Sequence, residues 1–188
     1  LCGIVFGLFS SMAHSKSLAG SYLAGSNAAM RGDYVAASKY FADTLILDPE
    51  NNFIKYNAML STLSMGDVNT AIKYAKEITL NNNNHLADLL IFIDYIKNER
   101  FVLASNLLKK NKENYTELLF GLLNGWTDLG RGKMSSVLKT FDEMDGNTTS
   151  KLLGQYHKAL ALAAVGDFEN ADKILSGNVN GSLRLTRG

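Results

Sequence analysis

The stretch RGDYVAASKYF, residues 31–41, joins a Gly-Asp pair to three small residues and a final aromatic pair. On its own, Gly32-Asp33 has the composition of a ligand-binding turn. The same pattern returns three times with a glycine, in SMGDVNTAIKYA (64–75), GRGKMSSVLKTF (130–141) and AVGDFENADKIL (164–175). A further copy, KNERFVLASNLL (97–108), has Glu99 in the glycine position. Positions 32, 66, 99, 132 and 166 lie 34, 33, 33 and 34 residues apart, which identifies a repeat.

Each copy has the local chemistry of a turn between two helices. Glycine adopts the positive φ needed at a helix C-terminus, and an aspartate after it caps the next helix. A small residue then permits close approach of the helices, at Ala37, Ala71, Ala104, Val137 and Ala171. The position four residues later, bulky in most copies, holds Phe41, Ala75, Leu108, Phe141 and Leu175. One such hairpin cannot bury its apolar face alone, so several are expected to stack.

The composition agrees with a helical protein. The chain has 188 residues, of which 46% are hydrophobic, and Pro49 is its single proline. Long stretches of Ala, Leu, Lys, Met and Glu at helical spacing predict an all-α fold with a substantial core.

The period and the helix–turn–helix pattern resemble the tetratricopeptide repeat over about residues 18–175. The resemblance implies an α-solenoid of about five stacked hairpins in a right-handed superhelix, with units near 18–51, 52–84, 85–117, 118–151 and 152–178. The eighth position of each unit, where the family favours a small residue, holds Gly25, Met59, Phe92, Gly125 and Ala159. The chain departs from the family in lacking its early tryptophan and in keeping its closing proline only at Pro49.

No reactive constellation stands out in the sequence. His14, His85 and His157 are far apart, lack metal-ligand spacing, and are expected to be solvated or to cap helices. GRGK at 130–133 lacks the upstream glycine and the Ser or Thr of a phosphate loop. We therefore predict no catalytic residue, no metal site and no cofactor, while a carboxylate pair assembled by folding remains open.

The charge is balanced, with 19 Lys and Arg against 18 Asp and Glu and a net charge of +1. The densest basic group, Lys109, Lys110 and Lys112, is sparse beside the basic face that neutralises several phosphates. We predict no nucleic-acid partner.

The resemblance directs attention to the first helix of each hairpin, which in this family lines a concave face that often binds peptides. Tyrosine and tryptophan there are typical anchors, whereas most apolar helix positions, and the aliphatic ones above all, belong to the core. The family's clamp for acidic tails uses Lys and Asn, and only Asn57 matches part of it, so an acidic C-terminal tail is not expected on this face. The predicted partner-binding groove consists of Tyr22, Ser26, Phe53, Tyr56, Leu60, Leu89, Ile93, Leu122, Trp126 and Tyr156.

The two ends of the chain do not follow the sequence pattern of the repeats. LCGIVFGLFSSMA is an apolar run too short for a membrane span, and small residues follow it, so residues 1–15 are predicted to be a secretory signal, N-terminally truncated, cleaved after Ala13 or Ser15. Cys2, the only cysteine, stands at the start of the run and not at its end, so a lipid anchor is not expected. The repeat domain is predicted over 16–175, and 176–188 as a truncated linker toward a further segment. The predicted location is the bacterial periplasm, without a membrane span after cleavage.

Three functional hypotheses follow, of which the first is favoured. It is an exported, non-enzymatic scaffold that binds a peptide or helix of a partner protein in an apolar concave groove. The alternative is a regulatory or docking module of a larger enzyme whose catalytic domain is missing from this sequence. The third is a hydrolase that uses a carboxylate pair brought together by folding.

Overall fold

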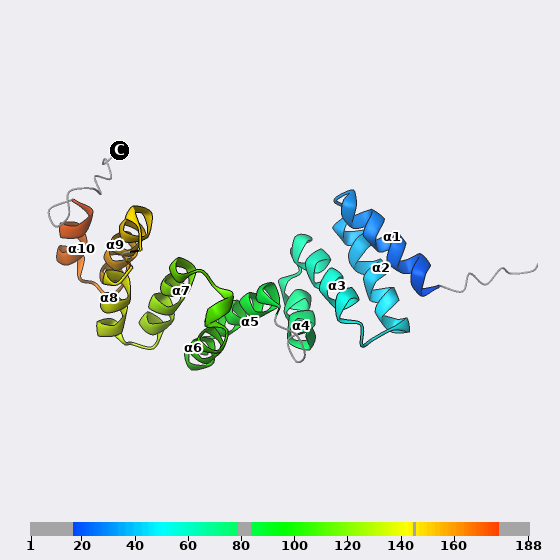
Figure 1. The fold of residues 1–188 in the computed structure, drawn as a ribbon, viewed down its shortest axis with the longest axis horizontal. Coiled ribbons are helices and arrows are strands. Elements are labelled where there is room, and N and C mark those ends of the chain that lie inside the picture. Colours follow the sequence, from blue (N-terminus) through cyan, green and yellow to red (C-terminus); the bar gives the residue numbers. More distant parts are fainter. Residues whose placement is uncertain (1–16, 79–83, 145, 177–188) are drawn as a thin grey trace, which may run out of the picture. The chain divides into compact units, whose positions relative to one another are not determined.

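The computed structural model describes residues 17–78, 84–144 and 146–176, and every regular element in these ranges is helical (Figure 1). The chain divides into two compact units, Leu1–Asn82 and Asn83–Gly188, and each is considered by itself. The predicted signal at 1–15 lies outside the described residues, as does the predicted linker beyond Ser176. Within the described ranges, no helix is both long and apolar enough to cross a membrane.

Unit 1 contains two helical hairpins whose successive helices pack against one another. Its core gathers Ala37 and Phe41 from the second helix with Ile54 and Ala58 from the third. The helices are α1 (Leu18–Met30), α2 (Tyr34–Leu47), α3 (Asn52–Ser64) and α4 (Val68–Ile78).

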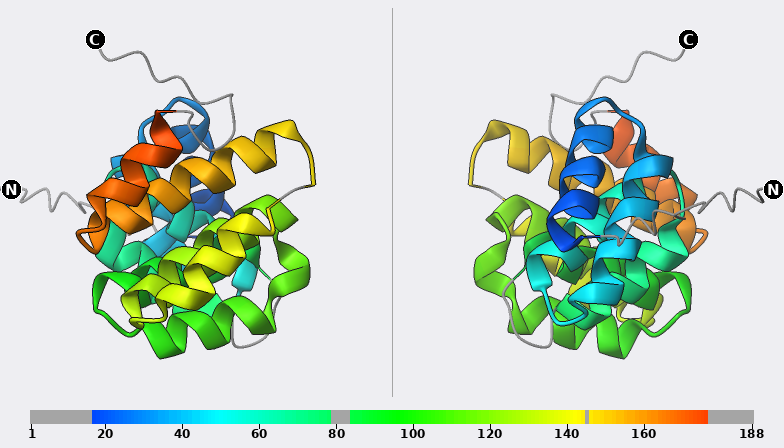
Figure 2. Two further views of the ribbon diagram at one scale, coloured as in Figure 1. Left: turned by 90° about the vertical axis from the view of Figure 1, so that its left-hand side faces the viewer. Right: turned by 90° about the vertical axis from the view of Figure 1, so that its right-hand side faces the viewer.

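Unit 2 continues the pattern, and Figure 2 shows α9 and α10 side by side. Among its described residues, each successive hairpin contributes to a cluster of buried side chains, around Phe92 and Leu108, Val137 and Phe141, and Ala159 and Ile174. The elements are α5 (His85–Lys97), α6 (Phe101–Lys110), the short 3-10 helix η1 (Lys112–Asn114), α7 (Glu117–Gly130), α8 (Met134–Asp142), α9 (Thr148–Ala164) and α10 (Phe168–Leu175).

The Gly-Asp pair of the opening stretch is the turn of the first hairpin. Gly32 has a φ of 76°, and the Asp33 side chain accepts a hydrogen bond from the Ala36 backbone N–H, 3.0 Å away. The other repeat glycines also have positive φ, and Glu99 keeps this conformation without being glycine, with a φ of 56°. The turn prediction is therefore confirmed, and the equivalents of Gly32 are Gly66, Gly132 and Gly166.

Small and large residues complement each other inside the hairpins. A Cβ atom added to Gly25 would lie 3.0 Å from the ring of Phe41, and one added to Gly125 would lie 2.5 Å from the ring of Phe141. Each phenylalanine thus occupies the space that the glycine leaves free on the preceding helix. These contacts confirm the predicted all-α fold of stacked hairpins, while the handedness of a superhelix stays a prediction.

Candidate partner-binding surfaces

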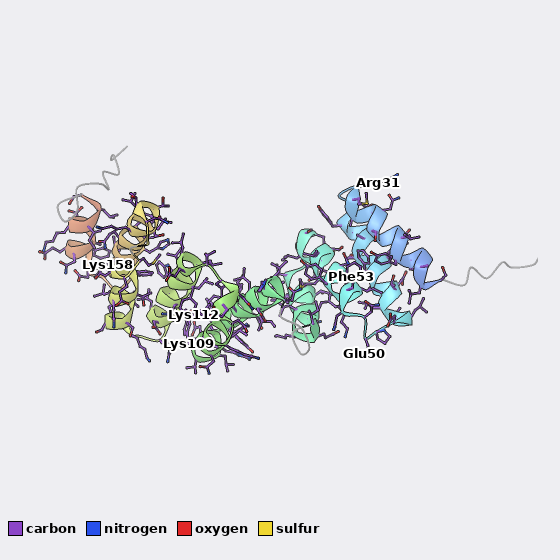
Figure 3. The ribbon with its side chains drawn as sticks, viewed as in Figure 1. Arg31, Glu50, Phe53, Lys109, Lys112 and Lys158 are labelled. Atoms are coloured by element: carbon purple, nitrogen blue, oxygen red, sulfur yellow. The ribbon has the colours of Figure 1, made fainter. Side chains whose placement is uncertain are left out.

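In unit 1, two aromatic rings of the predicted groove meet on the first helices of adjacent hairpins. The ring of Tyr22 on α1 lies 6.0 Å from that of Phe53 on α3 and 6.1 Å from that of the buried Phe41. Tyr22 is half-buried because it packs on the core, whereas Phe53 is 61% exposed (Figure 3). We call Tyr22 and Phe53 the first aromatic patch.

The other predicted residues of unit 1 are half-buried, namely Ser26, Tyr56 and Leu60. The amide of Asn57, the one candidate for a carboxylate clamp, donates to the Phe53 carbonyl oxygen over 2.8 Å. Because its own helix already engages this amide, the structure gives no support to a clamp in unit 1.

In unit 2, a second group of aromatic side chains surrounds His157. The indole N–H of Trp126 on α7 donates to Nδ1 of His157 on α9 over 3.0 Å, and the two rings lie 5.9 Å apart. The ring centroids of Tyr156 and Phe141 lie 5.6 Å and 6.0 Å from that of His157. We call Trp126, Tyr156 and His157 the second aromatic patch.

His157 belongs to the second aromatic patch, and sequence reasoning did not include it among the candidate residues. The prediction that it is solvated or caps a helix was wrong, since it stands within α9 and is half-buried among three rings. Its place one residue after Tyr156, and 31 residues from Trp126, was the only available signal. His85, by contrast, is the exposed first residue of α5, and His14 lies outside the described residues.

Burial lowers the pKa of the His157 imidazole below its ordinary value. Because Nδ1 accepts the indole hydrogen bond, the neutral ring carries its proton on Nε2. Protonation of Nδ1 would place two N–H groups against each other and break the link between α7 and α9. The hydrogen bond and the burial therefore favour the same neutral form.

A polar network flanks the second aromatic patch. The ammonium of Lys158 on α9, labelled in Figure 3, donates to both oxygens of Asp142 on α8, over 2.8 and 2.7 Å. The Gln155 amide donates to one of these oxygens over 3.2 Å. An apolar centre with a polar rim is the usual anatomy of a protein interface.

Three aliphatic residues complete the predicted set. Leu89 packs against the cluster around Phe92, and Leu122 against the cluster around Phe141, so both contribute to the core. Ile93 differs in being 45% exposed. The alternative that some predicted residues belong to the core therefore holds for Leu89 and Leu122.

The hydrolase hypothesis requires acidic side chains that folding brings together. The described residues contain no group of three His, Cys, Asp or Glu side chains placed to hold a metal ion. Burial raises the pKa of Asp88 and that of the Tyr115 hydroxyl, whose oxygen has no hydrogen-bond partner in the described part of the chain. Asp128 is engaged by Arg131 at 3.0 Å. The charge of Asp88 adds to the effect of burial in raising the pKa of Tyr115, so these two groups interact with each other.

Paired helices, glycine turns and interlocking small and large side chains define a helical-hairpin protein with the tetratricopeptide-repeat fold. No family model matches the chain, and no curated protein does.

Among solved structures, the chain is similar to YrrB, a TPR protein with an unusual peptide-binding site, at a TM-score of 0.68 and 13% identity over 90% of this chain and 88% of that one. It is also similar to residues 41 to the end of MamA from Desulfovibrio magneticus RS-1, at 0.67 and 13% over 90% and 97%. A further MamA structure gives 0.64 and 14% over 90% and 98%.

Proposed function

We propose that this protein is a non-enzymatic scaffold that binds a peptide or helix of a partner protein through apolar surfaces on the first helices of its hairpins. One observation carries the proposal: Phe53 is 61% exposed and lies 6.0 Å from Tyr22 on the neighbouring first helix. An exposed phenylalanine beside a tyrosine offers a partner a large apolar area with a polar handle.

The second aromatic patch supports the same proposal within unit 2. Trp126 and Tyr156 are half-buried and converge on one histidine, so little side-chain entropy is lost when a partner contacts them. Patches of this kind suit apolar side chains spaced along a helix or an extended segment.

The fold supports an interaction role. YrrB, which shares it, is described as having a peptide-binding site, and we extend peptide binding to this chain as part of the proposal. Export to the bacterial periplasm belongs to the proposal too, and it rests on the apolar run at residues 1–13.

Crosslinking followed by co-purification of the partner tests the binding face. We expect Phe53→Ala to reduce partner recovery several-fold while helical circular dichroism is unchanged, because the ring is exposed. Phe168→Ala is the matched control, since this phenylalanine on α10 is 69% exposed but stands on a second helix. Equal recovery with Phe53→Ala, or an equal loss with Phe168→Ala, would refute the assignment of the face.

Export has its own test. Mass spectrometry of the protein from the periplasmic fraction should find a mature chain that begins at His14 or Lys16, as cleavage after Ala13 or Ser15 requires. Recovery of peptides upstream of Ala13 from the mature protein would refute the signal assignment and leave the binding proposal intact.

A further inference from the structure

A shallow groove of about 520 Å³ lies at the starts of two second helices of unit 2. Its residues come from the beginning of α6 and from the turn between α7 and α8. They are Glu99, Arg100, Phe101, Val102, Leu103, Arg131 and Lys133.

The helices that begin in this groove lack the cap that their counterparts have. Asp33, Asp67 and Asp167 cap α2, α4 and α10, each accepting a hydrogen bond from the backbone N–H three residues on. In contrast, α6 and α8 follow Arg100 and Lys133, and neither has a side-chain cap within the described part of the chain.

A cationic residue at the N-terminus of a helix destabilises that helix. The helix loses the stabilisation that an aspartate cap would give, and a positive charge beside the positive end of the helix dipole destabilises it further. Both exceptions face the same groove. Two cationic cap positions that line the same groove make this groove a candidate binding surface.

Two of the three cations that line the groove form no ion pair in the described part of the chain. Arg131 is held by the Asp128 carboxylate at 3.0 Å and by the Ser105 hydroxyl at 3.1 Å. Arg100 and Lys133 are exposed and form no ion pair with any residue that the structure describes. Glu99 contributes one carboxylate to the groove, so the local balance favours anions.

Apolar side chains lie beside these cations. Val102 is 58% exposed and Leu103 45% exposed on the first turn of α6. The ring of Phe101 is half-buried and covers Gly130 at the end of α7, where an added Cβ would come within 2.3 Å of it. The groove therefore combines an aromatic side chain with two aliphatic side chains and unpaired positive charge.

We propose that this groove binds an acidic segment of a partner protein, with Asp or Glu side chains against Arg100 and Lys133 and an aliphatic side chain against Val102 and Leu103. The carboxylates would also supply the helix-capping acceptors that α6 and α8 lack. A protein fits better than a nucleic acid, because Glu99 and the aliphatic pair oppose a phosphate backbone and two unpaired cations neutralise few phosphates. The surface lies at the starts of second helices and does not depend on the aromatic patches.

The test uses a variant that restores the missing caps. Arg100→Asp with Lys133→Asp places aspartates where α2, α4 and α10 have them, so we expect a higher melting temperature. The probe is a fluorescein-labelled twelve-residue peptide of glutamates and leucines, followed by fluorescence anisotropy. We expect the double variant to bind it at least about tenfold more weakly, and salt to weaken binding to the unmodified chain. A gain in stability together with a loss of binding excludes misfolding as the cause.

Matched controls make the proposal falsifiable. Lys109→Asp with Lys151→Asp changes the net charge equally outside the groove, and it should keep the peptide affinity. The proposal fails if the control loses as much affinity, or if a peptide with glutamine in place of glutamate binds equally well. It also fails if single-stranded oligothymidine binds this groove more tightly than the peptide. Self-association that the cap variant abolishes, without any peptide binding, would identify a second copy of the chain as the occupant and overturn it.

Discussion

The first and second hairpins fill the same internal position with opposite arrangements. In α1–α2, Gly25 leaves a space that the ring of Phe41 occupies, whereas α3–α4 has Met59 and Ala75 at the equivalent places, both fully buried. The large side chain stands on the second helix in one hairpin and on the first helix in the other. The comparison teaches that these two hairpins keep a similar summed volume at this crossing although neither residue is the same, whereas the third hairpin has two large buried residues there, Phe92 and Leu108.

Removing the large partner breaks this arrangement with the largest expected effect. Phe41→Ala should lower the free energy of unfolding by about 3–5 kcal/mol, because the ring is fully buried and glycine opposite it cannot fill the cavity. Urea unfolding followed by circular dichroism measures the loss. Gly25→Met added to Phe41→Ala recreates the arrangement of the second hairpin and should restore part of it. A double variant less stable than Phe41→Ala would contradict the volume argument.

Adding one methyl group tests the same complementarity from the other side. Gly125→Ala should cost about 1–3 kcal/mol, since its Cβ would lie 2.5 Å from the ring of Phe141. Gly25→Ala should cost less, because the corresponding distance to Phe41 is 3.0 Å. The two unfolding midpoints, measured against the unmodified chain, give the order directly, and a reversed order would show that local relaxation dominates.

A smaller effect is expected where the third hairpin differs from the others in its turn. Glu99 has a φ of 56°, and at the same place the other hairpins have glycine. Glu99→Gly should raise the free energy of unfolding by about 1 kcal/mol, because a residue with a Cβ is strained in this conformation. Gly66→Ala, at a φ of 89° with no neighbouring atom within 4 Å, is the reciprocal control and should be destabilising through strain alone. A loss of stability with Glu99→Gly would mean that the turn is not strained.

Sequence reasoning reached the hairpin turns and their packing partners because both depend on local rules. Gly32 followed by Asp33 indicates a turn with positive φ and a cap on the next helix, and Phe41 follows at the same sequence spacing as its counterparts in the other repeats. Long-range side-chain contacts are not encoded by spacing in this way. The hydrogen bond from Trp126 to His157 joins residues 31 apart and depends on how α7 and α9 pack. The missing caps at Arg100 and Lys133 are visible in the sequence, but their convergence on one groove requires the fold.

The smallest predicted effect distinguishes the two aromatic patches by pH, since only the second contains a histidine. Burial lowers the pKa of His157, so as the pH falls through about 6.5 the unfolded chain takes up this proton before the folded chain does. The free energy of unfolding that neutral His157 contributes is fully present above pH about 6.5 and declines as the pH falls. It stops changing below the pKa of His157 in the folded chain. The variant His157→Gln has no imidazole to protonate, so the unmodified chain should lose more stability than this variant between pH 7.5 and 5. The other titrating groups, including His85, are the same in both proteins.

The fluorescence of Trp126, the only tryptophan, reports protonation of His157 directly, because the indole donates to this imidazole. The fluorescence transition should have its midpoint below about 6.5 in the unmodified chain and should be absent from His157→Gln. Parallel losses of stability in the two proteins would show that the pKa of His157 is the same in the folded and unfolded chains, and would contradict the prediction.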